Sequence, residues 1–141
     1  AIAAFVIANG ALSLGRKVTM FFTFWGLNIL RKKNPPKTKK DIFEKMFGFM
    51  MPRGSTRLKL SQMNFFGIGP KLIRFIMGKK NIDSLETFID NAKKGGVRLV
   101  ACQMSMDMMG IKKEELIDGV EIGGVAAYLG AAESSDNNLF I

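Results

Sequence analysis

A single cysteine is the most reactive side chain that this sequence offers. Cys102 ends a predicted strand over residues 97–102 and opens the stretch CQMSMDMMG over residues 102–110. If the strand belongs to a parallel sheet, the sulfur lies at its carboxyl end, where open α/β sheets bind ligands. Backbone N–H groups at the start of a following helix would stabilise a thiolate there. The alternative is a buried cysteine that packs like a small apolar side chain.

The composition limits the chemistry that can accompany this thiol. The 141 residues contain no histidine, so Ser–His and Cys–His nucleophile pairs cannot form within one chain. One cysteine forms no intrachain disulfide and leaves no internal resolving cysteine for a peroxidase cycle. The sequence therefore excludes the commonest nucleophile–base pairs and a disulfide framework.

Several neighbours of Cys102 could take part in a site. Ser105 and Asp107 could orient the thiol or a partner, or cap a helix, and we favour capping for both. The four methionines between residues 104 and 109 suit Cu(I), but methionine also fills irregular cores, which we favour. Gly123 and Gly124 could bind an anion before a helix, but a tight turn explains them without a longer nucleotide fingerprint. We predict no metal and no cofactor.

The elements that must position these residues alternate between strand and helix. Buried strands are predicted over residues 17–24 and 97–102, and further strands over residues 120–122 and 139–141. Helices are predicted over residues 1–14, 112–117 and 125–132, and a capping box from Asp83 to Glu86 opens another that ends at Lys94. The pattern predicts one α/β domain over residues 1–141, with a mostly parallel sheet. Because the chain opens on a helix pattern, we expect that a first strand precedes it. No apolar run is long enough for a membrane-spanning helix.

Residues 31–80 form a basic insertion in this alternation. They hold fourteen Lys or Arg against Asp41 and Glu44, a net charge of +12, whereas the other 91 residues carry −3. A linker is predicted over residues 31–40 and a polar, basic loop over residues 51–64. Two amphipathic helices are predicted from apolar stripes of Phe43, Met46, Phe47 and Met50, and of Ile68, Leu72, Phe75 and Ile76.

The basic insertion has several interpretations. It could dock on an anionic membrane surface or an acidic protein partner, or it could pack as a helical flap on the sheet or on a neighbouring subunit. Nucleic acid is disfavoured, because the phenylalanines lie on helix stripes rather than on an exposed sheet platform. The predicted partner-binding residues are Lys32, Lys33, Lys37, Lys39, Lys40, Phe43, Phe47, Lys71 and Arg74.

The stretch CQMSMDMMG at residues 102–110 resembles the signature of the DsrE/DsrF-like family, in its peroxiredoxin-like branch linked to intracellular sulfur oxidation. TMFFTFWGL at residues 19–27 and VEIGGVAAYL at residues 120–129 support the resemblance. It implies a three-layer α/β fold, homo-oligomers and a sulfur-relay role in which Cys102 accepts sulfane sulfur as a persulfide. A thiolate attack on sulfur suits a chain without histidine, since it requires no separate base.

The sequence leads to three functional hypotheses. The first is a sulfurtransferase-like carrier that takes sulfur on Cys102 and passes it to a partner protein or a low-molecular-weight thiol. The second is a non-catalytic oligomeric module that docks an acidic or membrane-associated partner through the basic insertion, with Cys102 as a packing residue. The third is an oxidoreductase with bound flavin or nicotinamide. For the first, we expect a cytoplasmic protein, with peripheral membrane contact as a further option.

Overall fold

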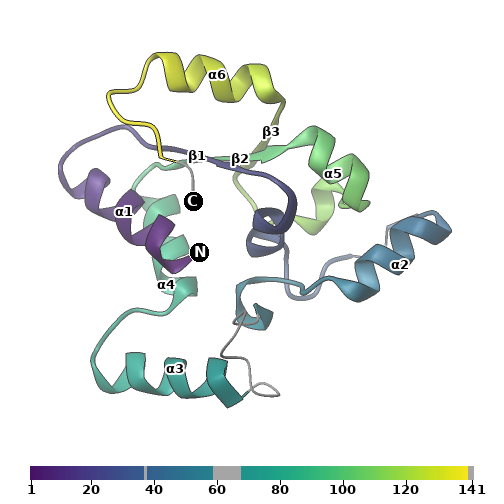
Figure 1. Ribbon diagram of the computed structural model, residues 1–141, viewed down its shortest axis with the longest axis horizontal. Coiled ribbons are helices and arrows are strands. Elements are labelled where there is room, and N and C mark those ends of the chain that lie inside the picture. Colours follow the sequence, from purple (N-terminus) through teal and green to yellow (C-terminus); the bar gives the residue numbers. More distant parts are fainter. Residues whose placement is uncertain (37, 59–67, 140–141) are drawn as a thin grey trace.

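A parallel three-stranded sheet lies at the centre of the computed structural model (Figure 1), which describes residues 1–36, 38–58 and 68–139 except the side chains of residues 43 and 47. The strands are β1 (Thr19–Phe22), β2 (Arg98–Cys102) and β3 (Val120–Gly123), in that order across the sheet. The middle strand, β2, pairs with both neighbours, placing Phe21 opposite Val100 and Cys102 opposite Gly123. Because all pairs are parallel, the three carboxyl ends meet at one edge.

Helices cover both faces of this sheet, which confirms the predicted α/β architecture. Helices α1 (Ile2–Ser13) and α4 (Leu85–Lys94) lie together on one face, and α6 (Val125–Glu133) crosses the other (Figure 1). Alternate residues of β1 reach the two sides. Phe22 packs on Phe5 of α1 with ring centroids 6.0 Å apart, whereas Phe21 packs on Tyr128 of α6 at 5.5 Å.

The two faces differ in how deeply they are buried. The main hydrophobic core lies on the α1 and α4 side, where Leu99 and Ala101 of β2 meet residues of both helices. Helix α5 (Gln103–Met109) and the short 3-10 helix η1 (Phe24–Leu30) complete this core. On the opposite face, no residue of α6 is buried. The α6 layer is therefore held by far less apolar burial.

Two predicted helix boundaries differ from the structure. The N-cap of α4 is Ser84, whose hydroxyl accepts from the Thr87 N–H, so the box predicted from Asp83 does not form. The Glu86 carboxylate instead accepts a 2.6 Å hydrogen bond from Ser55 of the basic insertion. The helix predicted over residues 112–117 is only the 3-10 turn η4 (Lys113–Glu115), since the next residues bond to the segment around Leu30.

The basic insertion contains the two predicted helices, α2 (Ile42–Met50) and α3 (Ile68–Lys79), with the 3-10 turn η2 (Ser55–Arg57) between them. Both helices stand away from the sheet, on the side of the molecule opposite α6 (Figure 1). The predicted loop over residues 51–64 begins on a buried residue, Met51, and its residues 59–64 lie outside the described part of the chain. The predicted last strand falls mainly on residues 140 and 141, which also lie outside it.

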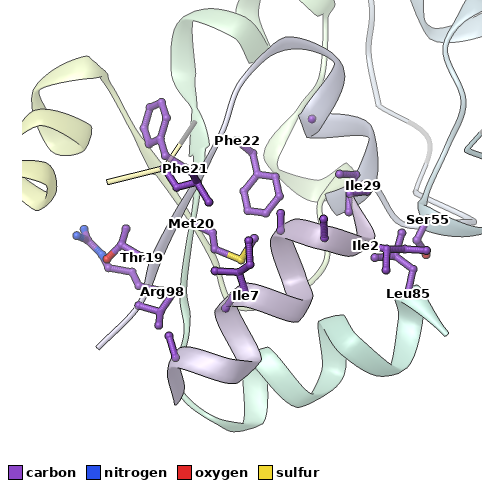
Figure 2. A pocket seen from close by; sticks show the side chains of 18 of the residues that line it. Ile2, Ile7, Thr19, Met20, Phe21, Phe22, Ile29, Ser55, Leu85 and Arg98 are labelled. Atoms are coloured by element: carbon purple, nitrogen blue, oxygen red, sulfur yellow. The ribbon is translucent and has the colours of Figure 1, made fainter. Parts of the chain in front are cut away.

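A broad hollow opens along the free edge of β1, between α1, α3, α4 and α6. Figure 2 shows Met20 and Phe22 beside Ile7 of α1 in this hollow, with Thr19 and Arg98 at its far end. Cys102 does not line it. This hollow is therefore separate from the thiol that the sequence singles out.

Candidate functional site

The central element of the candidate site is the end of β2, where the strand turns directly into α5. Cys102 is the last residue of β2 and the N-cap residue of α5, with φ −69° and ψ 116°. Its side chain makes no capping hydrogen bond. The predicted location, at the carboxyl end of a middle parallel strand, is therefore where the structure places the cysteine.

The Cys102 side chain is buried. It is only 2 % exposed in this chain, as the alternative of a packing cysteine would have it. Val100 lies on the α6 side of the sheet, because a Cβ added at Gly123 would approach Val100 Cγ1 at 2.9 Å and Ala127 Cβ at 3.1 Å. Cys102, two residues further along β2, faces the same side. Cys102 therefore lies on the α6 side of the sheet, which has less apolar burial.

The turn beside Cys102 is built from the two glycines that the sequence singled out. Gly123 pairs with Cys102 across the sheet, and Gly124 is the N-cap residue of α6. A Cβ added at Gly124 would meet no atom within 4 Å. Gly124 is therefore exposed where α6 begins.

Ser105 presents a buried hydroxyl one turn after the cysteine. It is fully buried, and its Oγ has no hydrogen-bond partner within the described residues. The predicted capping role is wrong, because Cys102 is the N-cap residue and no side chain caps α5. Ser105 occupies the third helical position, from which side chains reach back towards the N-cap residue. Buried polar groups are usually hydrogen-bonded, so this hydroxyl is an exception within the described residues.

Asp107 does not cap α5 either. Its exposed carboxylate lies near the end of the helix and accepts a 2.9 Å hydrogen bond from Gln103 Nε2. The same carboxylate contributes to raising the pKa of Lys112, after the larger effect of a hydrogen bond between Lys112 and Glu44. The described interactions of Asp107 are thus with neighbouring polar groups and not with Cys102.

The methionines of the motif divide between two sides of α5. Met106 and Met109 are buried in the main core, whereas Met104 and Met108 are exposed. Two of the four methionines therefore pack in the core, and the four do not share one face of the helix.

A buried charge cluster next to α5 was missed at the sequence level. Arg31 and Glu115 are both almost fully buried, with Arg31 Nη2 3.4 Å from Glu115 Oε1. Lys40 Nζ lies 2.5 Å from Glu115 Oε2 and donates to the Gly110 carbonyl at 2.7 Å. Arg31 Nη1 also donates to Asn28 Oδ1 at 3.3 Å. No spacing signal reveals this cluster, because Arg31 and Lys40 sit in a run of basic residues that reads as a solvated linker.

Electrostatics in this cluster show competition between burial and pairing. Burial alone would raise the pKa of Glu115, but the hydrogen bonds from Lys40 and the Lys112 N–H, with the charges of Lys40 and Arg31, bring that pKa below its usual value. Burial lowers the pKa of Arg31, with a smaller contribution from Arg53, while Glu115 opposes the change. A second pair, Lys112 Nζ and Glu44 Oε1 at 2.8 Å, joins α2 to the segment after α5.

The predicted partner-binding residues are not equivalent. Lys40 is committed to Glu115, and Lys32 Nζ lies 2.9 Å from the exposed Asp118 carboxylate. Arg74 donates to the carbonyl oxygens of Ser55 and Thr56. Lys33, Lys39 and Lys71 are exposed, while Lys37 and the side chains of Phe43 and Phe47 lie outside the described part of the structure. Among the described residues, no helix is long and apolar enough to cross a membrane.

The geometry defines a class of protein: a parallel α/β domain with one thiol at the carboxyl end of its middle strand. The DsrE/DsrF/DrsH-like family model matches residues 1–140, and the chain belongs to this family. It is 51% identical over 141 residues to the "Uncharacterized protein YrkE" of Bacillus subtilis, covering all of this chain and 88% of that protein. It is 34% identical over 141 residues to the "Sulfur carrier protein DsrE2" of Allochromatium vinosum, covering 97% of this chain and 87% of that protein.

Proposed function

We propose that this protein is a sulfur carrier that accepts sulfane sulfur on Cys102 as a persulfide and passes it to a partner. Family membership and the relative that is named a sulfur carrier support the class of function. The observation that supports the residue is the position of the single cysteine at the carboxyl end of β2, where α5 begins.

The proposed reaction is two displacements at sulfur with no net oxidation. The Cys102 thiolate attacks the terminal sulfur of a donor persulfide or polysulfide, forming a new S–S bond while the donor's S–S bond breaks and the donor leaves as a thiolate. An acceptor thiolate then attacks the terminal sulfur of the Cys102 persulfide, and Cys102 leaves as a thiolate. Because the chain has one cysteine, the acceptor thiol must belong to another molecule.

The buried sulfur must become reachable for either displacement. The α6 layer would lose little apolar burial on moving, since none of its residues is buried. The exposed Gly124, where α6 begins, directly follows Gly123, which pairs with Cys102. We propose that displacement of the first turn of α6 opens the path for donor and acceptor.

Ser105 has a defined role in this proposal. Its hydroxyl is buried one turn after Cys102 and forms no hydrogen bond within the described residues, so a rearrangement that brings it to a charged sulfur on Cys102 would break no existing bond there. Hydrogen bonds to charged groups contribute about 1.5–3 kcal/mol. Asp107, which is exposed and bonded to Gln103, is assigned only an orienting role towards a partner.

Mass spectrometry of the intact chain tests the proposal. After incubation with inorganic polysulfide and removal of the donor, the wild type should gain the mass of one sulfur atom, located on the peptide that contains Cys102. Cys102→Ser should gain none. Ser105→Ala should load about tenfold more slowly, whereas the exposed control Ser13→Ala should load at the wild-type rate. Absence of any gain on folded wild-type protein contradicts the carrier function.

The low exposure of Cys102 favours a second candidate, the non-catalytic oligomeric module in which this residue only packs. The rate of alkylation by iodoacetamide distinguishes the two. A carrier with an opening α6 layer reacts measurably under native conditions, and a destabilising α6 variant such as Ala127→Gly accelerates the reaction. If Cys102 only packs, it is alkylated no faster than the whole domain unfolds, and variants of equal stability have equal alkylation rates.

A further inference from the structure

The two helices of the basic insertion repeat one arrangement of side chains. Counted from an isoleucine at position 1, both helices have a lysine at position 4, apolar residues at positions 5 and 9, and a phenylalanine at position 8. The two sets are Ile42, Lys45, Met46, Phe49 and Met50 in α2, and Ile68, Lys71, Leu72, Phe75 and Ile76 in α3. On a helix, these positions place one apolar stripe beside one lysine.

Both stripes face solvent rather than the core. Phe49 is 91 % exposed and Phe75 is 70 % exposed, and the remaining apolar members of both stripes are exposed as well. The opposite sides of the helices face the protein. Gly48 of α2 is buried, while Ile73 and Met77 of α3 are half-buried. A surface helix normally turns its apolar stripe to the core, so these two helices are built to bury their stripes elsewhere.

The charges around the stripes are mainly positive. The insertion carries a net charge of +12, and one of its two acidic residues, Glu44, pairs with Lys112. Within the described residues, neither Lys45 nor Lys71 forms an ion pair. Cations beside exposed apolar stripes are the arrangement of helices that lie in the interface of an anionic bilayer.

We infer that α2 and α3 bind an anionic lipid surface, with Phe49 and Phe75 entering the headgroup region and the neighbouring lysines contacting lipid phosphates. The helices have 9 and 12 residues, so they lie on the bilayer and do not span it. A nucleic acid would match the charge but not the aliphatic and phenylalanine stripes. An acidic protein would need a separate apolar groove for each helix, whereas a membrane offers one continuous surface to both.

Vesicle flotation with the full chain tests this inference. Vesicles of phosphatidylglycerol and phosphatidylcholine should carry the protein at low salt, and pure phosphatidylcholine vesicles should not. Because each basic residue near an anionic surface contributes about fivefold to partitioning, Lys45→Ala/Lys71→Ala should weaken it about 30-fold. Phe49→Ser/Phe75→Ser should weaken it by about tenfold or more, because the aromatic anchors are lost. Far-UV circular dichroism checks that each variant keeps the wild-type helix content.

Matched controls lie outside the insertion. Lys17→Ala/Lys113→Ala removes two exposed lysines, and Leu14→Ser removes an apolar side chain that is 79 % exposed. Each control should change partitioning less than threefold. The two control lysines lie outside the insertion, so we expect their charges to be more distant from the lipid and screened. No binding to anionic vesicles at low salt overturns the inference, as does equal weakening by test and control variants. Binding to polyglutamate or DNA but not to vesicles also overturns it. The result is independent of the chemistry of Cys102.

Discussion

The buried Glu115 gives the sharpest test of how the basic insertion is attached to the fold. Its carboxylate accepts from Lys40 and from the Lys112 N–H and lies 3.4 Å from Arg31. Glu115→Gln keeps the size of the side chain but removes the only negative charge that the described structure places between Arg31 and Lys40. Two cations then share a buried site without compensation.

The expected loss follows from burial. The Arg31 and Glu115 side chains are 0% and 3% exposed, so their pair belongs to the class in which removal of one partner costs about 3–5 kcal/mol. In a domain of this size, 1 kcal/mol lowers Tm by about 3 °C, which predicts a decrease of about 9–15 °C. An exposed ion pair would cost less than about 1 kcal/mol.

Urea unfolding followed by circular dichroism, together with calorimetric Tm, measures this loss. The matched control is Glu114→Gln on the same turn, because Glu114 is exposed and its loss should change stability by at most about 0.5 kcal/mol. The double variant Arg31→Met/Glu115→Leu should recover much of the stability, since apolar residues can replace a buried ion pair. A loss below about 1 kcal/mol for Glu115→Gln would refute the interpretation that Arg31 depends on this carboxylate.

Three further results are expected. The pKa values of Glu115 and Glu44 lie below their ordinary 4.5 in the folded state, so their ion pairs stabilise the fold fully above that pH. Stability should fall as the pH drops below 4.5 towards the folded pKa values. Urea midpoints that do not change between about pH 6 and pH 3.5 would contradict this. Gly110 has φ +60° and a Cβ there would lie 2.6 Å from Glu44 Cβ, so Gly110→Ala should destabilise the fold by about 1–3 kcal/mol. The control Gly78→Ala, in α3 with open space around it, should be neutral or stabilising by up to about 1 kcal/mol. Equal effects of the two variants on the urea midpoint would argue against the contact between α2 and this turn. Light scattering should give a mass above that of one chain, because apolar residues of α6 such as Leu129 remain exposed, and a monomer at all concentrations would remove the predicted homo-oligomer.

The three strands and helices α1, α4 and α6 were predictable because their signals are local. Continuous β-branched and aromatic runs identify the strands, and glycine pairs mark their ends. The prediction that the first strand is buried on both faces was wrong, because β1 lies at the edge of the sheet and Phe22 is its one buried residue, and α5 was not among the predicted helices. The strand that ends at Cys102 and the helix that follows Gly124 lie where the sequence places them. Helix α4 starts one residue later than predicted. Local capping rules could not anticipate this, because Glu86 accepts a hydrogen bond from Ser55, which is distant in the sequence.

The rest depended on contacts between distant segments. Arg31 reads as part of a solvated basic linker, yet it is buried because Glu115, 84 residues away, supplies its counter-charge. The burial of Cys102 likewise depends on the α6 layer and the strand pair with Gly123, which no periodicity reveals. The apolar stripe of α3 was visible as a pattern, but only the structure shows that it points away from the core. In α2 the exposed stripe differs from the predicted one, because it contains Ile42 and Phe49, whereas the side chains of Phe43 and Phe47 lie outside the described part of the structure.

The measurement that tests the carrier proposal most directly is delivery of sulfur from the loaded protein. Full-length protein loaded by polysulfide and freed of donor is incubated with glutathione, and the mass of the Cys102 peptide is followed together with the glutathione persulfide formed. If Cys102 carries sulfur, the peptide loses one sulfur atom as an equal amount of glutathione persulfide appears, and Cys102→Ser delivers none. A wild-type protein that never acquires the sulfur, or that keeps it in the presence of excess thiol, is not a sulfur carrier of this kind.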